Sequence, residues 1–121
     1  MSSALNWFEI PVNDIARAAA FYGAVLGKTF EASETAPGFR MAEFPSDDGI
    51  AGALVQGEGY VPSAAGSIIY LSVAEDLNLA LARVRPAGGR VLMPKSPIGD
   101  GGFAAYVLDT EGNRVGLHST I

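Results

Sequence analysis

The stretch WFEIPVNDIARAAAFYGAVLGKTFEAS, residues 7–33, decides the fold of this chain. Residues 7–12 are rich in aromatic and branched side chains and predict a strand. Asp14 is placed to cap a helix, and Gly27 can adopt the left-handed conformation that ends one. Residues 28–33 predict a second strand. The helix between them has an apolar face at three- and four-residue steps, formed by Ile15, Ala18, Ala19, Tyr22, Val25 and Leu26.

The same order returns in IIYLSVAEDLNLALARVRPAGGRVLMP, residues 68–94. We expect a strand at 68–73, a cap at Glu75 or Asp76, a helix stop at 86–89 and a further strand from residue 90. In both stretches fifteen residues separate the valine that ends the strand from the glycine that follows the helix. This equal spacing indicates a repeated supersecondary unit. The apolar stripe of the second helix is Leu77, Ala80, Leu81 and Val84.

Two more strands complete each unit. In the first unit they are expected at 39–44 and 51–56, joined by the turn PSDDGI at 45–50. In the second unit they are expected in GFAAYVL and NRVGLHS, joined by the tight hairpin DTEG at 109–112. Each unit therefore has the order β-α-β-β-β and is too small to bury its own sheet.

We therefore expect an α+β fold in which two βαβββ modules form a curved sheet around a cleft. The helices should cover the outer faces, and the cleft is the default ligand site. The chain is expected to be a single domain over residues 1–121. Module one would span about 4–57, a linker about 58–66, and module two about 67–121.

Composition narrows the classes of function. With 49% hydrophobic and 17% charged residues, the 121-residue chain has the composition of an ordered globular domain. A formal net charge of −5 without any basic cluster argues against nucleic acid as a partner. The chain has no cysteine, so disulfides and thiolate ligands are excluded. Because no segment resembles a signal peptide or a membrane span, we expect a cytoplasmic protein with no membrane partner.

Three stretches carry a family resemblance: WFEIPVNDIARAAAFYGAVLG at 7–27, AGGRVLMP at 87–94 and FAAYVLDTEGNRVGL at 103–117. They resemble the vicinal oxygen chelate superfamily, which includes glyoxalase I, extradiol dioxygenases and bleomycin resistance proteins. More closely, the chain is similar to bacterial glyoxalase-related proteins that open with WFEIPV. The resemblance spans both modules and implies the glyoxalase/bleomycin resistance/dihydroxybiphenyl dioxygenase fold. It is a weak guide to activity, because that fold carries several chemistries.

The resemblance also implies where a metal would bind. In metal-dependent members, His, Glu or Gln side chains reach the cleft from the first and the last strand of each module. Carried onto this chain, those positions are Trp7, Ile68, Gly116 and Ala53, or Val55 if the register slips by two. None of these side chains can ligate a metal ion. We therefore expect no metal and no cofactor, which argues against the metal-dependent glyoxalase and dioxygenase mechanisms.

Two titratable residues are the candidate catalytic groups. Strand alternation places His118, the only histidine, on the cleft face with Gly116. It is either a partly exposed residue bonded to backbone or water, or a general base. Glu9 interrupts an apolar strand. It either makes a local hydrogen bond or an ion pair with Arg40 or Arg114, or serves as an acid–base group with His118 as its partner.

Other side chains on the inner strands are candidate ligand contacts. Apolar walls are expected from Trp7, Phe39, Met41 and Tyr70, and a second carboxylate from Glu43. Aromatic residues at strand spacing also serve as core, and a strand Glu is often simply exposed, so both alternatives remain open. The Gly-rich segment KSPIGDGGF at 95–103 predicts a mobile flap over the cleft.

These observations leave two main functions open. The first is a protein that binds a small molecule in its cleft without the usual metal, similar to the antibiotic-sequestering members of the superfamily. The alternative is a lyase or isomerase of the glyoxalase type, acting on a small oxygenated metabolite with Glu9 and His118 as acid–base groups. A metal enzyme with relocated ligands, Glu9, Glu43 and His118, is a third hypothesis. The resemblance also implies a homodimer.

Overall fold

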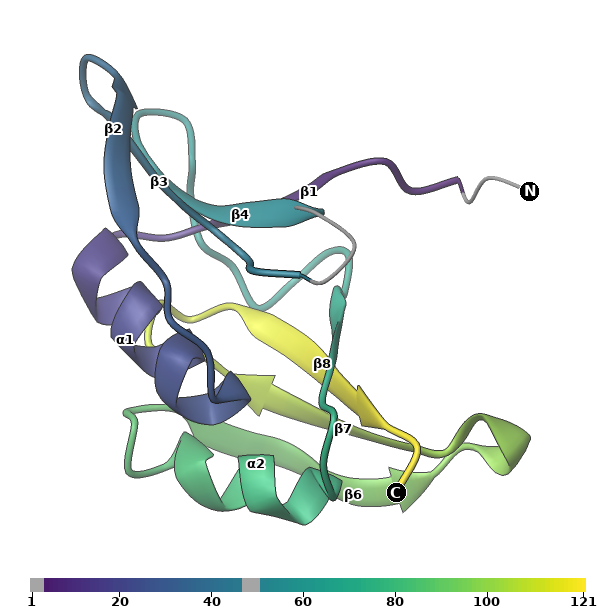
Figure 1. Ribbon diagram of the computed structural model, residues 1–121. Helices are drawn as coiled ribbons and strands as arrows, with labels where there is room; N and C mark the ends of the chain where they lie inside the picture. Colours follow the sequence, from purple (N-terminus) through teal and green to yellow (C-terminus); the bar gives the residue numbers. More distant parts are fainter. Residues whose placement is uncertain (1–3, 47–50) are drawn as a thin grey trace.

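The computed structural model describes residues 4–46 and 51–121. Over these residues the chain forms two α-helices, one 3₁₀ helix and eight strands, arranged as two β-α-β-β-β modules (Figure 1). The elements in chain order are β1 (Phe8–Pro11), α1 (Ile15–Leu26), β2 (Ala32–Ala36), β3 (Phe39–Glu43), β4 (Gly52–Gln56), β5 (Tyr70–Ser72), α2 (Leu77–Val84), β6 (Arg90–Pro97), the 3₁₀ helix η1 (Gly99–Gly101), β7 (Phe103–Leu108) and β8 (Arg114–Ser119). The expected α+β fold class is confirmed. The turn expected at 45–50 lies mostly outside the described residues.

Each module builds one four-stranded mixed sheet. The strand order is β1-β4-β3-β2 in the first sheet and β5-β8-β7-β6 in the second. In both sheets the first strand is parallel to the last strand of its module, and the other pairs are antiparallel. The helix α1 packs on the first sheet and α2 on the second. Module two therefore repeats the topology of module one.

The helix ends agree with the sequence. The side chain of Asp14 accepts a hydrogen bond from the backbone N–H of Arg17 at 3.0 Å, which satisfies one of the free donors of the first turn of α1. Gly27 ends α1 in the left-handed conformation at φ 66°. Of the two caps expected for α2, Asp76 is the one observed, and it accepts from the N–H of Asn78.

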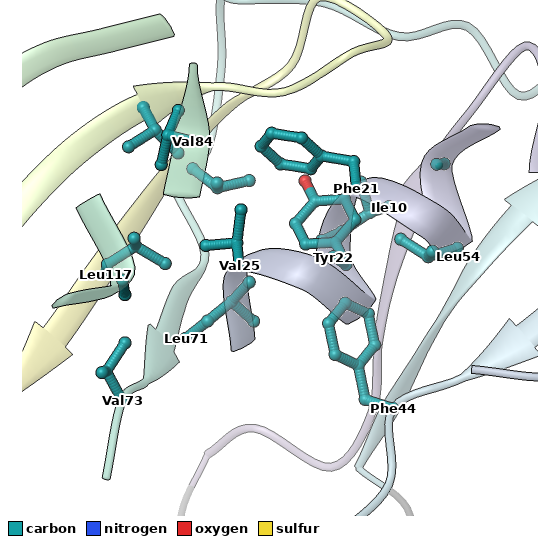
Figure 2. Packing of buried hydrophobic residues seen from close by; sticks show 14 of the residues in the cluster. Ile10, Phe21, Tyr22, Val25, Phe44, Leu54, Leu71, Val73, Val84 and Leu117 are labelled. Atoms are coloured by element: carbon teal, nitrogen blue, oxygen red, sulfur yellow. The ribbon is translucent and has the colours of Figure 1, made fainter. Parts of the chain in front are cut away.

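One hydrophobic core joins the two modules. The helices α1 and α2 pack against each other as well as on their sheets, so each module covers the apolar surface that the other cannot cover alone. Figure 2 shows residues of α1 between strand residues of module one, such as Leu54, and strand residues of module two, such as Leu71 and Leu117. Tyr22 of α1 meets Phe44 edge to face, with ring centroids 5.7 Å apart.

Residues 28–31 are a correction to the sequence prediction. The strand expected at 28–33 begins only at Ala32. The N–H of Lys28 closes the end of α1 by donating to the carbonyl of Gly23, and Phe30 packs edge to face against Phe44 at 4.9 Å. The segment therefore connects the helix to the strand, and its Phe30 side chain packs against the core. The strand pattern alone does not predict this contact.

In the segment expected to be a flap, residues 95–103, the two ends are strand and Gly99–Gly101 form η1 between them. Its first three residues end β6 and its last residue begins β7, and the connection is closed by a hydrogen bond from the N–H of Ile98 to the carbonyl of Gly102. Gly102 has φ 99°, and a Cβ there would meet the backbone of Ser119, so only glycine fits. This part of the chain is a closed hairpin of the second sheet.

The hairpin between β7 and β8 clamps module two onto module one. Glu111 accepts hydrogen bonds from the backbone N–H groups of Asn13 and Asp14 at 2.8 and 2.9 Å, and its other oxygen pairs with Arg17 Nε at 2.7 Å. Asp109 accepts a 2.6 Å hydrogen bond from the hydroxyl of Tyr22. We call Asp109, Glu111 and Asn113 the clamp; all three are buried.

No helix in the described ranges is long and apolar enough to cross a membrane.

Candidate functional site

We call the sheet faces that are turned away from the helices the open faces. On β8, Val115 and Leu117 belong to the core, so Gly116 and His118 lie on the open face, as strand alternation predicts. On β1, Ile10 belongs to the core and Glu9 lies on the open face. The cleft-facing residues expected from the sequence are therefore on the open faces.

The registers of the two sheets place a small residue between two larger polar side chains in each module. In the first sheet Ala53 pairs with Glu9 on one side and with Glu43 on the other. In the second sheet Gly116 pairs with Tyr70 and with Tyr106. The family ligand positions on the two central strands are thus flanked by two carboxylates in one module and by two phenols in the other.

Glu9 is held by two neutral donors. Its Oε2 accepts from Trp7 Nε1 at 3.2 Å and its Oε1 accepts from the hydroxyl of Tyr60 at 2.7 Å. Tyr60 in turn meets Phe39 edge to face at 6.3 Å. The hydrogen bond to Glu9 raises the pKa of Tyr60 above its usual value. The exposed Glu9 side chain is therefore oriented by local hydrogen bonds, and among the described residues it forms no ion pair with Arg40 or Arg114.

The family metal positions do not fit a metal ion. They carry Trp7, Ala53, Ile68 and Gly116, and none of these side chains offers a suitable oxygen or nitrogen. At Gly116 the space of a ligating side chain is taken by an aromatic ring, because a Cβ there would lie 2.5 Å from Cδ2 of Tyr70. Over residues 4–46 and 51–121, no three His, Asp or Glu side chains gather in a way that could hold a metal.

His118 and Glu9 have different hydrogen-bond partners. Its Nε2 is 2.5 Å from the carbonyl oxygen of Gly101, which ties β8 to the β6–β7 hairpin. In register it faces Ser72 on one side and Ala104 on the other. The structure therefore gives each of the two predicted catalytic residues its own partners and joins them by no hydrogen bond in the described part of the chain. Their catalytic roles stay predictions.

The predicted wall residues fall into two groups. Phe39, Met41 and Glu43 lie along β3 on the open face of the first sheet, with the first two half-buried and Glu43 exposed. Tyr70 lies on the second sheet, 50% exposed, and its hydroxyl is 2.6 Å from that of Tyr106. The structure thus brings Trp7, Glu9, Phe39, Met41 and Glu43 onto one sheet face and places Tyr70 and His118 on the other sheet.

A cavity of about 210 Å³ lies where the two modules meet. Its walls come from three parts of the chain: β1 with Glu9 and Pro11, the linker with Val61, Ser63, Ala65 and Ser67, and the start of β8 with Arg114 and the preceding Asn113. The linker is fixed in place because the N–H of Ser63 donates to Asn113 Oδ1 at 3.0 Å. The cavity is smaller than the sites of drug-sized ligands, which have volumes of roughly 300–1,000 Å³.

Sequence reasoning missed some of the residues that shape this region. Tyr60 and Ser63 lie in the segment interpreted only as a linker, and no local pattern predicts contacts to Glu9 or Asn113. The sequence indicates Arg114 only as an ion-pair partner for Glu9. Its position two residues before Gly116 on β8 is the signal that could have placed it on the open face.

Comparisons with known proteins agree with this architecture. The sequence model of the Glyoxalase/Bleomycin resistance protein/Dioxygenase superfamily matches residues 4–117. The "Putative glyoxylase CFP32" of Mycobacterium tuberculosis is 28% identical over 115 residues, which cover 93% of this chain and 44% of that protein. The corresponding protein of Mycobacterium bovis gives the same values. The chain therefore spans less than half the length of the curated relatives it matches.

Solved structures share the fold. A glyoxalase/bleomycin resistance protein/dioxygenase family enzyme from Burkholderia phytofirmans superimposes with a TM-score of 0.72 at 19% identity, covering 98% of this chain and 100% of that one. The genomically encoded fosfomycin resistance protein FosX from Listeria monocytogenes gives a TM-score of 0.68 at 17% identity, covering 98% and 94%. At these identities the likeness is one of fold.

Proposed function

The chain belongs to the Glyoxalase/Bleomycin resistance protein/Dioxygenase superfamily, and from this premise we propose that it binds a small molecule without the usual metal site. The observation that carries the proposal is the cavity of about 210 Å³ at the module junction, with Glu9 in its wall. Concave sites with a few convergent polar groups are where proteins bind small ligands.

The residues around the cavity support this proposal. Trp7 and Tyr60 fix the carboxylate of Glu9 by hydrogen bonds, so its geometry exists before a ligand arrives. Phe39 continues this aromatic surface through its contact with Tyr60. We propose that Trp7, Phe39, Met41 and Glu43, on the same open face as Glu9, extend the binding region beyond the cavity wall. Tyr70 lines a separate hollow of about 910 Å³, and its contact with the ligand stays a prediction.

The small cavity favours a metabolite over a large drug. A ligand that fills about 210 Å³ has few non-hydrogen atoms, and a wall of aliphatic side chains with Glu9 and Asn113 suits a partly apolar molecule with a hydroxyl or amino group. The ligand proposed is therefore a small oxygenated compound. The alternative of a glyoxalase-type lyase or isomerase that uses Glu9 and His118 stays a prediction, since no contact joins the pair.

The chain provides its own reporter for the test, because Trp7 is the only tryptophan and touches Glu9. A thermal-shift screen of small oxygenated metabolites should yield compounds that raise Tm and change the Trp7 fluorescence. Glu9→Gln should weaken these compounds about tenfold, by loss of a charge-assisted hydrogen bond.

The matched control is Glu34→Gln, on the exposed edge strand β2, which removes the same charge away from the cavity. It should leave binding unchanged. The proposal would be contradicted if the compounds bound Glu9→Gln and the wild type with equal affinity, or if no compound in the screen raised Tm. Turnover of any hit that disappears in Glu9→Gln and in His118→Gln would instead support the lyase or isomerase.

We also propose, from family membership, that the protein is a homodimer. The exposed apolar side chains of Val91 and Leu92 on β6 offer surface for such a contact. Sedimentation velocity should give twice the mass of the chain, and a single species of monomer mass at micromolar concentration would contradict the expectation.

A further inference from the structure

The cavity wall contains an arginine, Arg114, and one of its N–H donors has no hydrogen-bond partner among the described residues. Arg114 lines the cavity, and its Nε is buried without a hydrogen-bond partner in the described structure. Burying an N–H without an acceptor is costly, so such groups are rare in folded proteins unless something else satisfies them. Because Nε is enclosed, a ligand in the cavity would meet the outer guanidinium N–H groups instead, and Arg114 forms no ion pair over residues 4–46 and 51–121.

Two other polar residues of the wall have hydrogen-bond partners within the protein. Asn113 donates through Nδ2 to the carbonyl of Pro11 and to Asp109, and it accepts from Ser63. Glu9, the one carboxylate that the described residues contribute to the wall, accepts from Trp7 and Tyr60. The three ion pairs found over the described residues involve other cations, namely Arg17, Arg83 and Lys95. Arg114 is thus the wall residue with unspent hydrogen-bonding capacity and a positive charge.

The positive charge of Arg114 lies near the open face of the second sheet. The hydrogen bond to Tyr106 raises the pKa of Tyr70, and the positive charge of Arg114 opposes that rise. Arg114 is therefore within electrostatic reach of the phenol pair. A guanidinium presents its donors in one plane, which matches the two oxygens of a planar oxyanion.

We infer that the ligand of this cavity is a small monocarboxylate and that Arg114 receives its carboxylate group. This inference deepens the proposed function and rests on it. A monoanion is favoured over a dianion such as a phosphate ester, because Glu9 in the same wall repels additional negative charge. The other end of the molecule faces Glu9, which suits a hydroxyl or amino donor. The acidic net charge of −5 thus does not decide the charge of the ligand, because local donors outweigh it.

The test uses four probes that share one ring and differ in charge: benzoate, benzamide, benzylammonium and phenyl phosphate. Titrations followed by Trp7 fluorescence and calorimetry should show benzoate binding about tenfold or more tightly than benzamide, as expected for a charge-assisted pair. Phenyl phosphate and benzylammonium should bind more weakly than benzoate. Equal binding of benzoate and benzamide, tighter binding of phenyl phosphate or benzylammonium, or no binding of benzoate would overturn the inference.

Substitutions separate a binding role from a structural one. Arg114→Met should remove the preference for benzoate over benzamide, whereas Arg114→Lys should retain part of it, because the charge remains without the planar fork. Without ligand, Arg114→Met should have a Tm equal to or above that of the wild type, since it removes an unsatisfied buried donor. Arg40→Met removes the same charge outside the cavity wall and should change nothing.

The outcomes distinguish this inference from the proposed function. Binding of the neutral or cationic probe that depends on Glu9, without any preference for benzoate, would leave the small-molecule site standing and refute the carboxylate. A benzoate preference unchanged in Arg114→Met, or a large fall in Tm of that variant, would refute the role of Arg114. If Arg114→Met fails to fold, its role in ligand binding is refuted in favour of a structural one, while the comparison of probes on the wild type still tests the ligand class.

Discussion

Glu9 and Glu111 are both carboxylates near the junction of the modules, and they are used in opposite ways. Glu111 has a side chain with 0% exposure and accepts five hydrogen bonds, from Asn13, Asp14, Thr110 and twice from Arg17. Glu9 is exposed and accepts two, both from neutral side chains. The clamp carboxylate is saturated by the protein, while the cavity carboxylate keeps capacity for another molecule.

The pKa of Glu111 reflects its hydrogen bonds within the protein. Burial opposes the charge of Glu111, but hydrogen bonds from Arg17, Thr110, Asn13 and Asp14 outweigh it and lower its pKa from 4.5 to about 2. A carboxylate with a strongly shifted pKa is often taken as a sign of a functional site, yet structural ion pairs shift pKa values as well. In this protein the large shift marks the element that holds the modules together.

The largest expected effect is on the clamp. Glu111→Gln should lower the free energy of unfolding by about 3 kcal/mol at pH 7, the value that a pKa shift of this size implies. Urea unfolding monitored by far-UV circular dichroism measures it. Glu9→Gln is the matched control, since it removes an exposed carboxylate, and its effect should stay within about 0.5 kcal/mol. Similar losses in both variants would remove the distinction between clamp and site.

The same pKa gives a pH dependence with a definite sign. The folded state lowers the pKa of Glu111, so its contribution is fully present above pH 4.5 and is lost as the pH falls through about 2. We expect the stability difference between wild type and Glu111→Gln to shrink by most of its about 3 kcal/mol over that window. Unfolding curves at pH 6, 4.5, 3 and 2 give the profile. A difference that does not change with pH would show that Glu111 acts through packing instead of charge.

Smaller stability effects are expected at two tyrosines whose hydroxyls donate to carboxylates. Tyr22 is buried, and its hydroxyl donates to Asp109 at 2.6 Å, whereas Tyr60 is half-buried and donates to Glu9 at 2.7 Å. Tyr22→Phe should cost about 1–2 kcal/mol, because it deprives a buried carboxylate of a donor. Tyr60→Phe should cost less than about 0.5 kcal/mol, because water replaces the hydroxyl. Thermal and urea unfolding measure the loss of stability in each variant. A larger loss in Tyr60→Phe than in Tyr22→Phe would mean that the Tyr60–Glu9 hydrogen bond contributes more to stability than the buried one.

The sequence alone determined the repeated modules and their element order. Strand alternation, helix periodicity and capping depend on residues within a few positions of one another, so they can be recognised locally. Asp14, Gly27 and Asp76 act as the caps and stops that the sequence indicated. Alternation also placed Glu9, Gly116 and His118 on the open faces before any contact was known.

Only the tertiary structure decided how those faces are used. The contacts that fix Glu111 to Asn13 and Arg17 join residues separated by 98 and 94 positions, and Tyr60 reaches Glu9 across 51. Such contacts depend on how the two modules dock, and no periodic pattern encodes that docking. The ring of Tyr70 over Gly116, and the Arg114 Nε that finds no acceptor among the described residues, arise for the same reason. The sequence therefore indicated which side chains face outward, and packing between the modules determined how many hydrogen bonds each of them makes within the protein.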